Sequence, residues 1–110
     1  MAVGFVIVGQ DSWRCLDYTG SWETLQSAKE LGSKAYTLFT TMHNMGLPKV
    51  HTVTVDLQKG LLLVNAENGT EHNITVDVFY PDISYRAVLE FVQQIWLADY
   101  SKEFAAKVGF

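Results

Sequence analysis

Hydrophobic residues recur along this chain with two different spacings, and the change from one spacing to the other predicts its secondary structure. Residues 50–57 alternate between apolar and polar, with Val53 and Val55 on one side, which is typical of a half-buried strand. A tight turn that contains Gly60 leads to a second, more apolar strand at residues 61–66. The spacing therefore predicts a β-hairpin in the middle of the chain.

A spacing of three to four residues predicts one long helix from about residue 22 to residue 45. Ser21 is suited to cap its first turn, and Gly46 stands where a left-handed residue commonly ends a helix. Gly32 permits close approach of another backbone, either the chain's own sheet or a second subunit. The stripe consists of Leu25, Ala28, Ala35, Leu38, Phe39, Met42 and Met45.

The two ends of the chain also carry regular patterns. Residues 3–8 and 13–18 predict an antiparallel hairpin, and apolar residues on both sides of its first strand favour a sheet covered on both faces. Residues 73–80 predict another strand, which Pro81 ends, and a second helix is expected from about residue 83. The buried stripe of that helix is expected at Val88, Phe91, Val92 and Ile95, followed on a shifted face by Leu97, Tyr100 and Phe104.

These elements predict the order β-β-α-β-β-β-α in a single domain that covers residues 1–110. A chain of 110 residues has the usual length of one domain. The expected fold class is α+β, with a five-stranded antiparallel sheet, a long helix after the first hairpin and a second helix at the C-terminus.

The composition is apolar for a chain of this length. Hydrophobic residues make up 48% and charged residues only 18%, which is below the usual quarter. The surplus fits either a tightly packed core or a surface that a partner covers, and both interpretations stay open.

The charge pattern excludes several classes of partner. The net charge is −4 and the lysines and arginines are scattered, which disfavours binding to nucleic acid or to an acidic membrane surface. No apolar run approaches the roughly 20 residues of a membrane-spanning helix. The first eight residues lack the basic region of a secretory signal, and Cys15 is the only cysteine. We therefore expect a cytoplasmic protein that reaches membranes only through partners.

The titratable and nucleophilic residues do not have the spacing of a known active site. His43, His51 and His72 do not fall in a zinc pattern, and Cys15 is better explained as a small core residue than as a nucleophile. The single Gly20 before the long helix falls short of a phosphate-binding loop.

The remaining charged candidates are equally weak. Asp56 and Asp77 lie on predicted strands and are best explained as solvated residues of a polar face. Arg14 and Arg86 are the candidates for an arginine finger, although exposed arginines are usually only solvated. The sequence therefore predicts no enzyme, no cofactor and no metal site.

The order of helix ends, turns and apolar strands carries a resemblance. The helix end at 45–47, the strand at 50–57, the turn at 59–60 and the strands at 61–64 and 74–79 resemble the second half of a roadblock domain. The opening segment 4–9 and the strand after it resemble the first hairpin of a longin domain. Two features differ: the chain starts directly in a strand, without the helix that precedes it in roadblock proteins, and the loop at 65–73 is longer than a minimal hairpin.

The resemblance to the roadblock/longin superfamily implies a profilin-like sandwich. It also implies a non-enzymatic, dimerising scaffold or adaptor that regulates small Ras-like GTPases or serves vesicle-trafficking and motor complexes. In roadblock pairs the long central helices pack together and edge strands join into one sheet, and the matching segments here are 22–45 and 50–57. The residues expected at such an interface are Ala28, Gly32, Ala35, Tyr36, Phe39, Met42, Val53 and Val55. The implied partners are a second copy or a related chain, and a small GTPase.

Two other functions stay open at this point. A small-molecule sensor or an enzyme would use a pocket between sheet and helices, for which Trp13, Trp22 and Trp96 are candidate lining residues. Alternatively, the chain is a structural subunit of a larger assembly whose activity lies elsewhere.

Overall fold

The computed structural model describes residues 4–9, 12–44, 46–67 and 69–96, and the backbone alone for Ile95 and Trp96. Within these residues the fold class is α+β, as predicted. The elements are β1 (Phe5–Val8), β2 (Trp13–Leu16), α1 (Trp22–Asn44), β3 (Val50–Asp56), β4 (Leu61–Ala66), β5 (Glu71–Thr75), α2 (Pro81–Phe91) and a π-helical segment, η1 (Val92–Trp96). The predicted order lacks η1. The stripe positions Leu97, Tyr100 and Phe104 lie outside the described residues.

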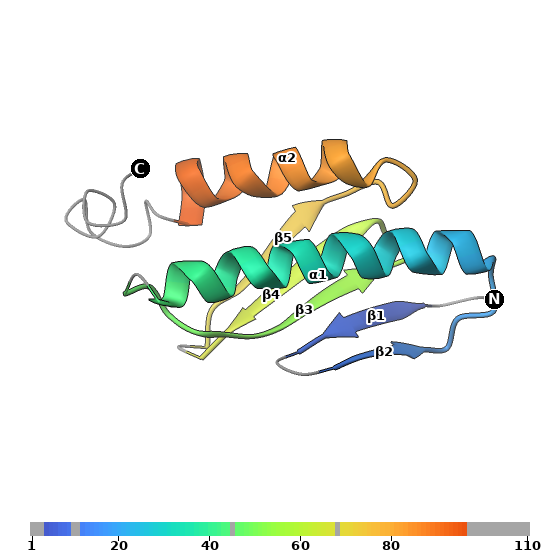
Figure 1. Ribbon diagram of the computed structural model, residues 1–110, viewed down its shortest axis with the longest axis horizontal. Helices are drawn as coiled ribbons and strands as arrows, with labels where there is room; N and C mark the ends of the chain where they lie inside the picture. The colour runs from blue at the N-terminus through green and yellow to red at the C-terminus, as the bar shows by residue number, and fades with distance from the viewer. Residues whose placement is uncertain (1–3, 10–11, 45, 68, 97–110) are drawn as a thin grey trace.

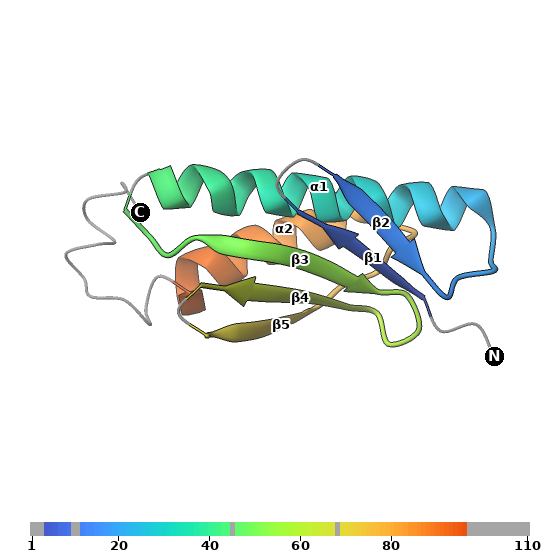
Figure 2. The ribbon, with the colours of Figure 1, turned by 90° about the horizontal axis from the view of Figure 1, so that it is seen from below.

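The five strands form one sheet in the order β2-β1-β3-β4-β5, and every neighbouring pair is antiparallel. Figures 1 and 2 show α1 and α2 side by side on the same face of this sheet, with α1 over β1 and β3 and α2 nearer to β5. No described element covers the other face. The prediction of a sheet covered on both faces is therefore wrong for the described residues, because both helices pack on one side and against each other.

The core lies between the sheet and the two helices. From α1, Leu31 and Phe39 are fully buried, and from α2 and η1, Val88 and Val92 are fully buried. A Cβ at Gly32 would lie 3.0 Å from Cγ2 of Val8, so glycine allows α1 to approach the sheet closely. The sheet residues in this core with no exposed surface are Val6, Val53, Val55, Leu62 and Val64.

Both ends of α1 are formed as the sequence predicts. The backbone N–H of Thr24 donates to Oγ of Ser21 at 3.2 Å, which caps the first turn. Gly46 has a φ of 108°, and its N–H donates to the carbonyl of His43 at 2.9 Å. The N–H of Leu47 donates to the carbonyl of Met42 at 3.1 Å, which completes a Schellman motif.

The segment before α2 differs from the prediction. The strand expected at 73–80 is β5, which starts at Glu71 and ends at Thr75, and Pro81 is the first residue of α2 rather than a strand terminator. Proline suits the first position of a helix because its missing N–H would have no helical partner there. Val76 and Val78 remain buried although they lie outside the strand, which explains why the alternating pattern continues past its end.

Three other strands are shorter than predicted, and β1 begins only at Phe5. β2 ends at Leu16, and Asp17 then adopts a positive φ of 53°, which breaks the extended conformation. β3 ends at Asp56, and its pairing with β4 is irregular between Val50 and Thr52.

Candidate protein-interaction surfaces

The residues expected at a partner interface mostly lie in the chain's own core. Of the α1 positions, Tyr36 is partly buried, and the others, Ala28, Gly32, Ala35, Phe39 and Met42, are buried against the sheet. A partner helix would contact these side chains only if α1 left the sheet. The sequence pattern marks an apolar stripe correctly, but it does not tell whether the stripe faces the chain's own sheet or a second subunit.

The strand part of the expected interface is wrong. Val53 and Val55 have no exposed surface, and their strand, β3, is the third of five. Both of its edges are paired, with β1 on one side and β4 on the other. It therefore has no free edge to join with a second sheet, and the edge strands are β2 and β5.

One candidate surface is the open sheet face, the side of the sheet opposite the helices (Figure 2). We define it by Phe5 and Ile7 of β1, Leu61 and Leu63 of β4, and Leu16 of β2. The first four are only partly buried, and Leu16 is 40% exposed. Alternation along each strand places them there, because their neighbours in sequence point toward α1 and α2.

Polar residues separate and border these apolar positions. Thr54 of β3 pairs with Ile7 on one side and Leu63 on the other, so a polar column lies between two apolar columns. Arg14 of β2 and Glu71 of β5 stand near opposite borders of the same face, and both are exposed. The surface therefore has two apolar columns separated by polar residues of β3, with opposite charges at its two edges.

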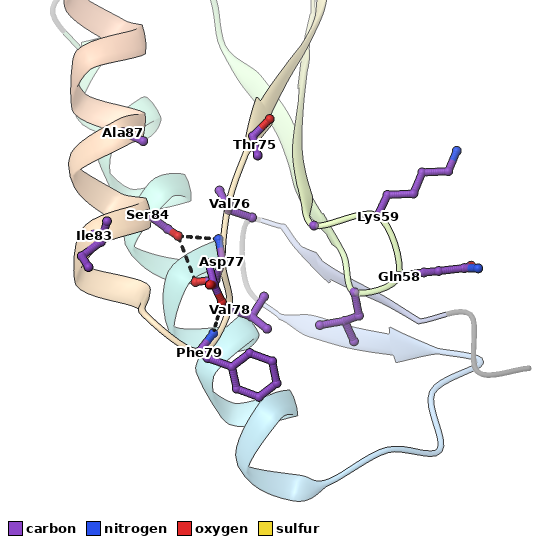
Figure 3. Close-up of a pocket in the computed structure, with 12 residues that line it drawn as sticks. Gln58, Lys59, Thr75, Val76, Asp77, Val78, Phe79, Ile83, Ser84 and Ala87 are labelled. Carbon is purple, nitrogen blue, oxygen red and sulfur yellow. Dashed lines mark hydrogen bonds between the residues drawn. The ribbon is translucent and has the colours of Figure 1, made fainter.

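A second candidate surface is the β5–α2 groove, formed between α2 and β5, which no other described strand pairs on its outer edge. Two adjoining hollows of about 570 and 270 Å³ share Thr75 and Ala87 in their linings, so together they follow the strand edge. The first hollow extends to Lys59 in the β3–β4 turn, and the second to Glu90 and Gln94. Figure 3 shows the residues that line the first hollow, which come from the β3–β4 turn, the end of β5 with the segment after it, and the start of α2.

Hydrogen bonds from Ser84 and Asp77 hold one end of this groove in place. The hydroxyl of Ser84, which is 4% exposed, accepts from the N–H of Asp77 at 2.7 Å and donates to its carbonyl at 2.9 Å (Figure 3). The carboxylate of Asp77 accepts from the N–H of Phe79 at 3.0 Å. The segment between β5 and α2 is therefore fixed by its own polar groups before any ligand binds.

The β3–β4 turn at the same end is also internally bonded. Oδ1 of Asp56 accepts from the N–H groups of Gln58 and Lys59, each at 3.0 Å. Gly60 has a φ of 66°, and its carbonyl accepts from the N–H of Val76 at 2.8 Å. Asp56 is only 5% exposed, so the expectation of a solvated carboxylate is wrong for this residue, which serves the turn instead.

Large apolar side chains lie at this end of the groove, where Phe79 and Ile83 line the first hollow and Tyr80 is next to Phe79 in sequence. Phe79, Tyr80 and Ile83 are 69%, 60% and 66% exposed. Single exposed apolar residues are common, but three within five positions beside a groove are typical of a surface that binds another molecule.

The described residues offer little chemistry for catalysis. No group of three or more histidine, cysteine or acidic residues among them is arranged to hold a metal ion. Burial, and then the nearby carboxylate of Asp17, raise the pKa of the Cys15 thiol, which lowers the fraction of reactive thiolate at neutral pH. Arg14 and Arg86 are exposed.

Trp13 and Trp22, the two tryptophans whose side chains the structure describes, belong to different elements and differ in their surroundings. The ammonium of Lys29 lies 4.4 Å from the ring centre of Trp13 on β2, whereas Trp22, at the start of α1, is 69% exposed. The side chain of Trp96 lies outside the described part of the chain. Neither of the other two lines the β5–α2 groove.

Neither α1 nor α2, within the residues that the structure describes, is long and apolar enough to cross a bilayer. No family model, curated protein or solved structure matches this chain. Its function is therefore inferred from its own surfaces.

Proposed function

We propose that this protein is a non-enzymatic scaffold that dimerises by packing its open sheet face against the same face of a second copy. The observation that supports this proposal is the pair of apolar columns, β1 and β4, on either side of β3. When one face of an antiparallel sheet meets only water, the residues of each strand usually alternate between apolar on the covered face and polar on the open face. The residues of β1 and β4 are instead apolar on both faces.

The spacing of the columns suits a two-fold axis that runs along β3. Such an axis places β1 of one copy over β4 of the other, and each contact then occurs twice. Phe5 and Leu61 both pair with Asp56 of β3. Ile7 and Leu63 both pair with Thr54, two residues away on the same strand. Each apolar side chain of one column therefore has an apolar partner at the same level of the facing sheet.

The charges at the borders favour the same orientation. With the axis along β3, the strand β2 of one copy faces β5 of the other, and Arg14 then lies near the partner copy's Glu71 position. With the axis across the strands, β2 would instead face β2, and the two Arg14 side chains would share one border. Opposite charges at the rim favour the first arrangement over the second.

Sedimentation equilibrium, from micromolar to hundreds of micromolar protein, tests the dimer. We expect the mass of two chains for the wild type and of one chain for Leu63→Arg, because a charge buried between two apolar columns has no partner. Leu16→Glu, at the more exposed rim, should weaken the dimer with less risk to folding. Trp22→Lys is the matched control, since it removes an exposed apolar side chain elsewhere.

Two results would contradict this proposal. One is a wild-type protein that stays monomeric over the whole concentration range. The other is a dimer that Leu63→Arg and Leu16→Glu leave intact while circular dichroism reports folded variants.

For the partner of such a dimer we propose a small Ras-like GTPase or a trafficking or motor complex in the cytoplasm. The support is the resemblance in the order of helix ends, turns and strands. Binding of immobilised protein to small GTPases loaded with GDP or with a GTP analogue, together with their rates of nucleotide hydrolysis, tests this part. The absence of any binding or rate change would remove the partner class and leave the dimer proposal standing.

A further inference from the structure

We propose that the β5–α2 groove binds an extended peptide segment of a partner protein, which adds to β5 as a sixth strand. This proposal goes beyond dimerisation and does not depend on it, because the groove lies at the sheet edge and the proposed dimer uses the sheet face.

The hydrogen-bond register leaves part of the β5 backbone free for such a strand. The N–H of Val76 bonds the carbonyl of Gly60, and in an antiparallel ladder every second residue then bonds the same neighbour. His72 and Ile74 therefore direct their backbone groups toward β4, whereas Asn73 and Thr75 direct theirs off the sheet. Among the described residues, no backbone hydrogen bond from outside the ladder reaches Asn73 or Thr75.

Ser84 sets the limit of this free edge. Asp77 continues the outward alternation, but Ser84 occupies both its N–H and its carbonyl. An added strand would therefore pair along Glu71–Thr75 and stop before Asp77, which limits it to a short segment. Natural edge strands are often protected by charge, proline or a bulge; β5 contains no proline, and its one acidic residue, Glu71, stands at its first position.

The side chains of α2 and η1 give the groove a place for alternate residues of the added strand. Ile83, Ala87, Glu90 and Gln94 lie three to four positions apart and line the hollows beside β5. Ala87 stands where the two hollows join, and its short side chain keeps the passage between them open. In strand addition, main-chain hydrogen bonds supply affinity and such pockets select the alternate side chains.

The charges at the two ends define the chemistry of the peptide. Lys59 lines the groove at one end, together with Asp77, whose carboxylate accepts from the N–H of Phe79, and Glu90 lines it at the other; the salt bridges among the described residues join only Lys34 to Glu30 and Asp82. The groove between them is bordered by Phe79 and Ile83. The complementary ligand is a segment with apolar residues at alternate positions, an acidic residue toward Lys59 and a basic residue toward Glu90.

A strand without its own helix fits this groove better than a second copy of β5. The inward side chains of β5, such as Ile74, are already buried in the chain's own core. If the β5 of a second copy paired with this edge, its inward side chains would stay in the core of that copy and would not enter the hollow at Ala87. The α2 helices of the two copies would also lie beside each other.

Selection from a phage-displayed library of random seven-residue peptides tests the proposal. We expect enrichment of peptides with β-branched or other apolar residues at alternate positions and opposite charges at their ends. The enriched peptide, labelled with fluorescein, is then titrated by fluorescence anisotropy. Ala87→Trp, which fills the junction of the hollows, should weaken binding by at least about tenfold, roughly the loss of one or two hydrogen bonds with their apolar contacts.

Three controls make the result specific. Ala87→Ser keeps a small side chain and should bind as the wild type does. N-methylation of alternate peptide amides should abolish binding, because it removes the main-chain donors. Leu63→Arg, on the open sheet face, should leave peptide affinity unchanged even where it dissociates the dimer.

The outcomes separate the two proposals. The groove proposal is overturned if no peptide is enriched, or if the enriched peptide binds a folded Ala87→Trp variant as tightly as the wild type. It is also overturned if Ala87→Trp, and not Leu63→Arg, dissociates a dimer, since a second copy would then occupy the edge. Loss of binding with Leu63→Arg would instead place the peptide on the open sheet face.

Discussion

The two faces of the sheet are built from similar residues and have different surroundings. In β1, Val6 and Val8 are 0% and 6% exposed beneath α1, while their neighbours Phe5 and Ile7 on the open sheet face are only partly buried. β4 repeats the pattern with Leu62 and Val64 against Leu61 and Leu63. The chain's own helices therefore account for the apolar residues of one face and not for those of the other.

The central strand shows what a water-facing pattern looks like in the same sheet. Along β3, Val53 and Val55 point toward the helices, and Thr52 and Thr54 point away from them. The contrast between β3 and its neighbours indicates that the open sheet face is apolar where a two-fold partner would contact it and polar along the axis.

The largest expected difference between the faces is the effect of removing a phenylalanine ring. Phe39→Ala opens a cavity beneath α1 and should cost about 3–5 kcal/mol of unfolding free energy. Phe5→Ala removes a partly exposed ring and should cost about 1 kcal/mol in the monomer, since less area leaves water on folding. Urea denaturation in dilute protein measures both values. Equal losses would show that the open sheet face is as essential to the monomer as the core.

An exchange of neighbouring residues on β3 sharpens the comparison. Val55→Thr keeps the side-chain shape but buries a hydroxyl in the core, and should cost about 1–3 kcal/mol. Thr54→Val makes the reverse change on the open sheet face. It should leave the unfolding free energy of the monomer within about 0.5 kcal/mol of the wild-type value. It should also strengthen the dimer, because it adds apolar area at the two-fold axis. A dimer weakened by Thr54→Val would argue against the proposed packing.

The smallest expected difference concerns thiol reactivity on the two faces of β2. Because its pKa is raised, Cys15 should react with a maleimide more slowly at neutral pH than Leu16→Cys placed in a Cys15→Ser background. Its rate should rise with pH to a midpoint above that of the exposed thiol. Protection of the residue 16 thiol at high protein concentration would further support a covered face.

The same pKa has a consequence for stability. The unfolded chain, with an unperturbed thiol, loses this proton at a lower pH than the folded chain does. The contribution of this thiol to the free energy of unfolding is therefore fully present below its pKa in the unfolded chain. It is lost as the pH rises through its pKa in the folded chain. Cys15→Ser should remove this part of the alkaline loss in a series of thermal melts, and an unchanged alkaline profile would assign the loss to other groups.

The sequence predicts elements that local chemistry determines. The limits of α1 follow from Ser21 and Gly46, whose cap and left-handed turn act within a few residues. The β3–β4 hairpin follows from its alternation and Gly60. These features do not depend on distant parts of the chain, so the pattern of residues is enough to locate them.

The sequence is less informative where residues far apart along the chain determine the local structure. The end of β5 depends on Ser84, whose hydroxyl replaces a neighbouring strand at Asp77, and the alternating Val76 and Val78 conceal this interruption. Likewise, the stripe that contains Gly32 has the same composition whether it faces the chain's own sheet or a partner. The sequence pattern does not locate the β5–α2 groove for a similar reason, although Ile83, Ala87 and Glu90 of α2 and Gln94 of η1 follow one another at intervals of three to four residues.

A cross-link at Thr54 tests most directly whether the open sheet faces of two copies meet. Thr54 lies on β3, on the proposed two-fold axis, and facing sheets are about 10 Å apart, within reach of a short bismaleimide. In a Cys15→Ser background, we predict that Thr54→Cys forms a covalent dimer in high yield, whereas Thr37→Cys, exposed on α1, does not. A Thr54→Cys protein that reacts fully with single maleimides but stays a covalent monomer would contradict the account.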